Sequence, residues 1–161
     1  MKTRSNVRKL SQDEIEEFLR SQKVGTLSMN DGKNSYAVPL AYFYDGEQLY
    51  LTIGGQGRKM AYIKKNPNVC FVVCWIPEDF GLSKMSWKSV VCDGVIEQVT
   101  DPDGIKKAVQ TGEKHLGMPA GTWDKMLEMT LKKPEASNFW KIKISDIGGQ
   151  GVEDFKEEFY E

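Results

Sequence analysis

The sequence predicts a mainly β protein, an antiparallel β-barrel with helices at its periphery. Several short segments alternate apolar and polar residues, which is typical of strands with one buried face. Most connections between these segments are short turns, whereas parallel strands need crossovers of a dozen or more residues. Together these observations favour an antiparallel barrel over a parallel βαβ architecture.

The chain is expected to begin with a helix of about three turns over residues 11–20. Ser11-Gln-Asp-Glu14 is a capping box, in which the serine and the glutamate satisfy each other's backbone N–H groups. The apolar residues that follow share one helical face. The sequence therefore predicts an amphipathic N-terminal helix.

Three strands should follow this helix as an antiparallel meander. Asn30 to Lys33 and Asp45-Gly46 are turn-forming segments, and they separate runs of apolar alternation. The expected strands are Val24 to Met29, Ser35 to Tyr44 and Gln48 to Ile53.

The rest of the chain alternates strands and helices, and no linker divides it, so we expect a single domain over 1–161. The expected elements are a short helix from Arg58 to Asn66, a central strand 69–75, a loop 77–84, a long strand 86–99 bent near Asp93-Gly94, a helix from Pro102 to about Gly112, a connector 117–121, a helix capped by Thr122 and ended by Pro134, a strand 138–144, and a tail 148–161 that is glycine-rich and then acidic.

The composition is that of an ordinary globular protein. Hydrophobic residues make up 40% and charged residues 28%, and the net charge is −1 from 22 basic and 23 acidic residues. This balance argues against nucleic acid as the main partner, because binding to phosphate backbones needs a basic excess. No apolar run reaches the roughly 20 residues of a membrane span or resembles a signal peptide, so we expect a cytoplasmic protein.

The cysteines and the histidine do not indicate a disulfide framework or a metal site. Cys70, Cys74 and Cys92 are odd in number and form no CxxC pair, so we interpret them as buried free thiols. His115 has no cluster of carboxylates or thiolates nearby in the sequence. We expect it at the surface or at a helix end.

The most informative segment is a glycine-rich turn between a strand and a helix. Gly54-Gly55-Gln56-Gly57 follows the apolar run Leu49 to Ile53, and Arg58 and Lys59 open the next helix. Glycines let backbone N–H groups approach an anion, and a helix N-terminus carries a positive partial charge. The segment is therefore either a phosphate-binding turn or a tight turn with two solvated basic residues. Its glycine spacing fits neither the dinucleotide fingerprint nor a Walker loop.

Pro39 stands in the middle of a predicted strand. Proline cannot donate a hydrogen bond to a sheet, so this position indicates an edge strand, a bulge or a gap that faces a ligand. An edge strand is the simplest interpretation.

Six segments follow one another in a characteristic order. They are Val24-Gly-Thr-Leu-Ser, Tyr36-Ala-Val-Pro-Leu-Ala, Leu49-Tyr-Leu-Thr, Gly57-Arg-Lys, Asn66-Pro-Asn-Val-Cys-Phe and Trp87-Lys-Ser-Val-Val with Gly94. This ordered set resembles the FMN-binding split β-barrel of the pyridoxamine 5′-phosphate oxidase-like superfamily, nearest the branch of the 5-nitroimidazole resistance proteins. The resemblance covers residues 11 to 100 well, and the later helices and strand only in outline.

The resemblance implies a homodimer with two FMN sites at its interface. It implies that the strand Tyr36 to Ala41 runs along the flavin ring, mostly through backbone groups, and that the partner subunit contributes residues near Trp87. Of the four tryptophans, Trp75, Trp87, Trp123 and Trp140, at most two would contact the flavin. The implied cofactor-binding residues are Val38, Pro39, Leu40, Leu51, Thr52, Ile53, Gly57, Arg58, Lys59, Trp87, Ser89 and Trp140.

Two departures from the family pattern limit what the resemblance implies about activity. Pyridoxamine phosphate oxidases hold their substrate with a C-terminal arginine and histidine, but this chain has no arginine after Arg58 and no histidine except His115. Many nitroimidazole-type relatives have a histidine where this chain has Thr52. Both specific activities are therefore disfavoured.

The hypothesis that remains is a flavoenzyme that reduces a small organic molecule, with the flavin supplying the chemistry. No catalytic residue is assigned; Tyr36, Tyr42 and Thr52 are the candidates for a general acid. The alternatives are a non-catalytic protein that binds a flavin, a deazaflavin or haem for storage or sensing, and an interaction domain without a cofactor.

Overall fold

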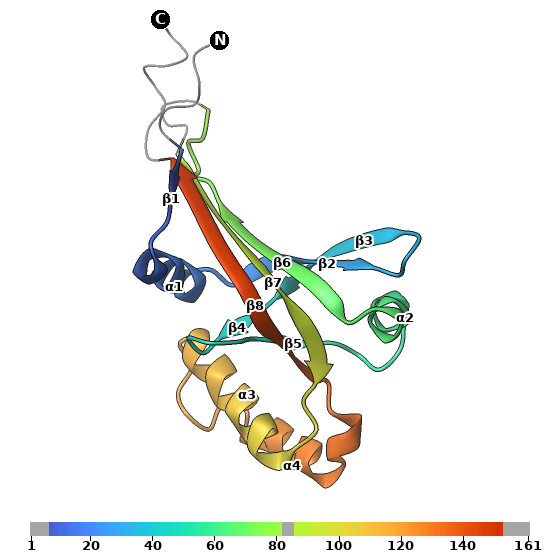
Figure 1. Ribbon diagram of the computed structural model, residues 1–161. Helices are drawn as coiled ribbons and strands as arrows, with labels where there is room; N and C mark the ends of the chain where they lie inside the picture. The colour runs from blue at the N-terminus through green and yellow to red at the C-terminus, as the bar shows by residue number, and fades with distance from the viewer. Residues whose placement is uncertain (1–6, 82–85, 153–161) are drawn as a thin grey trace, which may run out of the picture.

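The chain forms a strongly curved antiparallel sheet, a split barrel, in a computed structural model that describes residues 7–81 and 86–152 (Figure 1). The strand order within these residues is β3-β2-β6-β7-β8-β5-β4, and β1 pairs with β8. The strands are β1 Arg8–Lys9, β2 Val24–Asn30, β3 Ser35–Ala41, β4 Phe43–Tyr44, β5 Leu49–Thr52, β6 Asn68–Trp75, β7 Trp87–Gln98 and β8 Phe139–Val152. The predicted antiparallel barrel with peripheral helices is confirmed.

Within the described residues, four α-helices lie around the barrel (Figure 1). The helices are α1 Gln12–Ser21, α2 Arg58–Lys65, α3 Pro102–His115 and α4 Asp124–Lys132, and a 3-10 turn, Pro134–Ala136, follows α4. Apolar residues of α1 and α2 belong to the core of the barrel, while α3 and α4 pack on a second cluster around Phe43 and Phe139. No helix in the described ranges is long and apolar enough to cross a membrane.

The capping box predicted for the first helix is present. The Ser11 side chain accepts a hydrogen bond from the Glu14 N–H, and the Glu14 carboxylate accepts one from the Ser11 N–H. The Arg8 guanidinium also donates two hydrogen bonds to this carboxylate, at 3.0 and 2.8 Å. These hydrogen bonds, led by that from Arg8, lower the pKa of Glu14 to about 2. The ion pair thus joins β1 to the start of α1.

The predicted three-stranded meander is wrong, because the second strand breaks at Tyr42. Strands β2 and β3 pair, and β4 and β5 pair, but the two hairpins lie at opposite ends of the strand order. The Tyr42 N–H donates to the Lys23 carbonyl at 3.0 Å, and its hydroxyl donates to the Leu19 carbonyl at 2.6 Å. Burial of this fully enclosed tyrosine redirects the chain from one side of the barrel to the other.

The gap between the two ends of the sheet involves the strand that carries Pro39. Among the described strands, β3 pairs only with β2, where Pro39 lies opposite Thr26, so the edge-strand interpretation is confirmed. Cα atoms of β3 and β5 approach within 8 Å without forming a ladder. The barrel is therefore split along this line.

The last strand is longer than predicted, and the expected tail at residues 148–152 belongs to it. Strand β8 pairs with β7 as far as Val152, with Gly149 opposite Val90. A Cβ on Gly149 would lie 2.9 Å from Leu10 and 3.0 Å from Ile15, so glycine lets the strand pass beneath α1. Residues 153–161 of the predicted tail, and residues 82–84 of the predicted loop, lie outside the described residues.

The boundaries of the last two helices also differ from the prediction. Helix α3 continues past Gly112 to His115. Glycine stands at position 112 because a Cβ there would collide with the Trp123 ring. Thr122 does not cap α4; its hydroxyl donates to the Pro119 carbonyl, and Trp123 occupies the N-cap position.

Candidate functional site

The first part of the candidate site is the uncapped N-terminus of α2. Gly57 is the N-cap residue and has φ +110, a conformation that favours glycine, and no side chain caps the helix. Apart from the neighbouring residues of the turn, no atom of the described residues lies within 4 Å of the place where a Cβ would stand at Gly54, Gly55 or Gly57. The turn is therefore open to a ligand.

The charge around this helix is uniformly basic. Arg58 and Lys59 begin α2, Lys64 and Lys65 end it, and its first turn contains no acidic residue. The helix dipole adds a positive partial charge at the same end as Arg58. Backbone N–H groups, a guanidinium and an ammonium thus meet at one place, which suits a phosphate.

Arg58 is held in place by an aromatic ring of β3. Its guanidinium carbon lies 3.9 Å from the centroid of the Tyr36 ring and 5.7 Å from that of Tyr62. The two tyrosine rings lie 5.3 Å apart, and Tyr62 is buried in the core. A cation over an aromatic face at this distance is attracted by the ring quadrupole. The contact joins the start of α2 to the edge strand across the split.

The edge strand β3 turns alternate residues toward and away from the core. Tyr36, Val38 and Leu40 pack against the barrel core, and Pro39 is exposed on the outer face. The strand also carries backbone groups with no sheet partner on its outer side. A flat ligand beside β3 would therefore meet mostly backbone and Pro39.

Three of the predicted cofactor-binding residues have side chains buried in the core. Leu51 is fully buried, Ile53 is 2% exposed, and Trp140, which lies opposite Leu51 on β8, is 8% exposed. Only Thr52 on this strand has an exposed side chain. Any contact of Leu51 or Ile53 with a flavin would therefore involve their backbone.

Trp87 and Ser89 lie at the other end of the sheet from α2. Ser89 pairs with Cys74 on β6, whereas α2 leads into the beginning of β6 at Asn68. Six residues of strand separate these positions, roughly 20 Å. Figure 1 shows the start of β7 beside β1, away from α2. One chain does not bring Trp87 and Ser89 together with Arg58.

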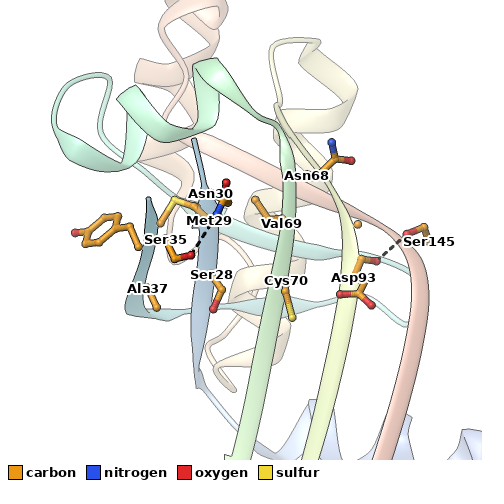
Figure 2. A pocket seen from close by; sticks show the side chains of 12 residues that line it. Ser28, Met29, Asn30, Ser35, Ala37, Asn68, Val69, Cys70, Asp93 and Ser145 are labelled. Carbon is orange, nitrogen blue, oxygen red and sulfur yellow. Dashed lines mark hydrogen bonds between the residues drawn. The ribbon is translucent and has the colours of Figure 1, made fainter. Parts of the chain in front are cut away.

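A hollow of about 750 Å³ opens on the outer face of the sheet near α2 (Figure 2). Small and polar side chains line it, among them Ser28, Cys70 and Asp93, which point to the same side of their strands in Figure 2. Tyr36, the ring under Arg58, is also part of its wall. An anion held by Arg58 would thus lie at the margin of a broad concave surface.

Of the three candidates for a general acid, Tyr42 is excluded. Burial raises the pKa of its hydroxyl well above the usual range, and the hydroxyl already donates to the Leu19 carbonyl. Tyr36 is half-buried beside Arg58, and Thr52 is exposed.

The cysteine prediction holds for one residue of three. Cys92 is buried, but Cys70 is half-buried and Cys74 is exposed, because both point to the outer face of β6. His115 ends α3, as one interpretation predicted. Its Nδ1 accepts the Tyr44 N–H at 3.3 Å, so Nε2, 2.7 Å from the Gln22 carbonyl oxygen, carries the proton. The described residues contain no group of three or more metal-binding side chains.

Sequence reasoning missed the support that Tyr36 gives to Arg58. The two residues are 22 positions apart and meet only because β3 and α2 lie on either side of the split. No local pattern in the sequence signals such a contact.

Comparisons with known proteins agree on one family. The family model described as pyridoxamine 5′-phosphate oxidase matches residues 11–150. A FAD-binding protein of Mesorhizobium loti is 27% identical over 91% of this chain and 98% of its own, with a TM-score of 0.65. A candidate 5-nitroimidazole antibiotic resistance protein of Bacteroides thetaiotaomicron is 19% identical over 97% of this chain and 99% of its own, with a TM-score of 0.71, which shows the shared fold. No curated protein matches the chain.

Proposed function

This chain belongs to the pyridoxamine 5′-phosphate oxidase family, and from that premise we propose that it binds FMN and acts as an oxidoreductase on a small organic molecule. One observation carries the proposal. The Arg58 guanidinium rests on Tyr36 at the open glycine turn, beside the edge strand of the split barrel. A phosphate at α2 and a flat ring along β3 would fit this arrangement.

The residues present suit FMN at its charged end. Arg58 and Lys59 would hold the phosphate together with backbone N–H groups of the first turn of α2. Tyr36 would keep the guanidinium oriented, and Pro39 would present a flat, exposed surface to the ring. FMN supplies the transfer of electron pairs when bound, and the chain supplies binding, orientation and exclusion of water.

A homodimer would complete this site. The outer face of the sheet has exposed apolar residues in the part of the chain that the structure describes, including Val24 at 57% and Val91 at 40%. A second copy packed on this face would bring its own Trp87 and Ser89 toward the first copy's Arg58. This role for Trp87 and Ser89 is part of the proposal.

The experiment that tests FMN binding compares FMN with riboflavin, which lacks the phosphate. In Arg58→Ala, the affinity for FMN should fall about 10- to 150-fold, because a hydrogen bond to a charged group is lost. The affinity for riboflavin should change little. Arg58→Lys should recover only part of the loss, since an ammonium cannot form a bidentate contact. Titration of both flavins against the wild type and the two variants, followed by fluorescence quenching, measures the six affinities.

Lys64→Ala is the matched control, because Lys64 is exposed on the same helix but in its last turn. It removes one positive charge without touching the N-terminus of α2, so the affinity for FMN should remain near that of the wild type. Equal losses for FMN and riboflavin in Arg58→Ala would show that Arg58 does not hold the phosphate.

Two further measurements separate an FMN enzyme from the alternatives. The visible absorption spectrum of freshly purified protein distinguishes a flavin from a deazaflavin or haem. Steady-state oxidation of NADH or NADPH by the FMN-loaded protein, with a small organic acceptor, distinguishes an enzyme from a protein that only stores or senses the flavin. Absence of turnover with bound FMN would favour the non-catalytic alternative.

A further inference from the structure

A second hollow lies between the end of β5 and α4, and we name it the α4 groove. Its volume is about 790 Å³, which is enough for a drug-sized molecule. Its apolar wall consists of Trp123, Met126, Met129 and Phe139, and Thr52 at the end of β5 also lines it. Figure 1 shows α4 at the end of the molecule opposite β1.

The methionines of the groove are not needed to attach α4 to the barrel. Leu127 and Leu131, four residues apart, pack against the cluster that contains Phe139. Met126 and Met129 remain 38% and 65% exposed, and α4 has no buried residue. Neighbouring exposed apolar side chains in a concave surface indicate a binding site. Methionine side chains adapt to the shape of a ligand and make favourable contacts with aromatic rings.

The charge of the groove is positive. Lys125 and Lys133 line it, and no aspartate or glutamate does. Within the described ranges neither lysine forms an ion pair, whereas Lys107 pairs with Asp45 at 3.3 Å. An apolar wall with two unpaired ammonium groups is complementary to a molecule that has a flat apolar body and a negative charge.

We propose that the α4 groove binds a small aromatic organic acid, with its rings against Met126, Met129 and Trp123 and its carboxylate near Lys125 or Lys133. Thr52 connects this groove to the strand that leads into the glycine turn. The further step, that the flavoenzyme acts on the bound acid, rests on the proposed function. The binding of the acid in the groove does not depend on the proposed function.

The test uses NMR of the full-length chain with ¹³C-labelled methionine methyl groups, without and with added FMN. The probe is 1-naphthoate, and 1-naphthamide is its uncharged counterpart. On titration with 1-naphthoate, the methyl signals of Met126 and Met129 should shift, because the ring current of an aromatic ring changes the local magnetic field at the methyl groups. Those of Met29 and Met60, buried in the barrel core, should remain in place. Conservative Met126→Leu and Met129→Leu variants assign the two signals.

Two variants separate the charge from the apolar wall. Lys125→Gln combined with Lys133→Gln should weaken naphthoate binding about 2- to 30-fold, the range that two exposed ion pairs provide, and leave naphthamide binding unchanged. Met129→Glu should weaken the binding of both compounds by about tenfold or more. Lys132→Gln is the matched control, since Lys132 is exposed on α4 but does not line the groove, and it should change neither.

Three results would overturn the proposal. The first is no shift of the methyl signals of Met126 and Met129, and the second is equal affinity for 1-naphthoate and 1-naphthamide. The third is methyl shifts that depend on the protein concentration and not on the naphthoate concentration, which would assign the groove to a second copy of the chain. If FMN binds but naphthoate does not, the groove proposal fails and the proposed function stands. If naphthoate binds in the groove of the FMN-free protein, but does not bind to the FMN-loaded protein and does not change the flavin absorption spectrum, the groove proposal stands. Its link to the flavin then fails.

Discussion

At the scale of single residues, the placement of Arg58 depends on Tyr36. Arg58 is exposed, and an unsupported exposed arginine would sample many rotamers. The ring at 3.9 Å restricts it before any ligand arrives. A side chain that is already oriented loses less entropy on binding a phosphate.

Replacement of Tyr36 tests this support. Tyr36→Leu should weaken FMN binding about 2- to 5-fold, the contribution of an exposed cation–π contact, and Tyr36→Phe should change it little. Because Tyr36 acts through Arg58, the loss should vanish in the Arg58→Ala background. A double-mutant cycle measured with FMN provides the four affinities. An undiminished loss in that background would mean that Tyr36 contacts the flavin directly.

Cys92 differs from the other cysteines in its chemistry. Burial, with smaller effects of Cys70 and Asp93, raises the pKa of the Cys92 thiol to about 12. The thiolate is the reactive form, and at pH 8 only about 1 in 10⁴ of these thiols would be ionised. Cys92 should therefore resist iodoacetamide in the folded protein and react once denaturant is added. Peptide mass mapping measures this, and modification of Cys92 at the rate of a free cysteine without denaturant would contradict the burial.

At the scale of elements, two glycines led to wrong predictions of where a helix or a strand ends. Gly112 was expected to end a helix, and Gly148 to begin a tail, because glycine is common at both kinds of position. In the structure Gly112 makes room for Trp123, and Gly148 belongs to β8, in which the next residue, Gly149, passes beneath α1. Gly112 and Gly149 each make room for a neighbour distant in the sequence, which no local pattern signals. Capping chemistry, which is local, was predicted correctly at Ser11.

Gly112→Ala tests the packing of α3 against the segment before α4. The added Cβ would lie 2.4 Å from the Trp123 ring and 3.2 Å from Phe43, so one of these must move. Overpacking costs roughly 1–3 kcal/mol, and alanine in a helix returns about 1 kcal/mol, so we expect a net loss of stability of up to about 2 kcal/mol. Denaturant unfolding measures it. Gly148→Ala, with no atom within 4 Å of its Cβ position, is the control and should remain within about 0.5 kcal/mol of the wild type.

At the scale of the whole molecule, the sequence predicted the type of fold but not how the sheet closes. Strand lengths and turns were sufficient for an antiparallel barrel, because they depend on local alternation. The separation of β3 from β4 depends on Tyr42, whose hydroxyl finds its partner 23 residues earlier in the chain. Of the predicted site, the phosphate end at Gly57 to Lys59 lies together by sequence proximity, whereas Trp87 and Ser89 lie far from it within one chain.

That separation leads to the prediction that the site is shared between two chains. If Trp87 contributes to FMN binding, it must do so from a partner subunit, because roughly 20 Å of strand lies between its end of the sheet and α2. Arg58→Ala and Trp87→Ala homodimers should each bind FMN poorly. In a dimer that combines one chain of each kind, a two-fold axis places both changes in one site and leaves the other site intact.

Mixing the two variants therefore provides the decisive measurement. Coexpression in equal amounts should place half of the chains in mixed dimers, so about a quarter of all sites should bind FMN with the affinity of the wild type. Two affinity tags isolate the mixed dimer, in which half of the sites should be restored. Light scattering checks that each preparation is dimeric. If the mixed dimer binds no better than its parents, Arg58 and Trp87 do not meet across an interface; a monomer that holds FMN at wild-type affinity would also contradict a shared site.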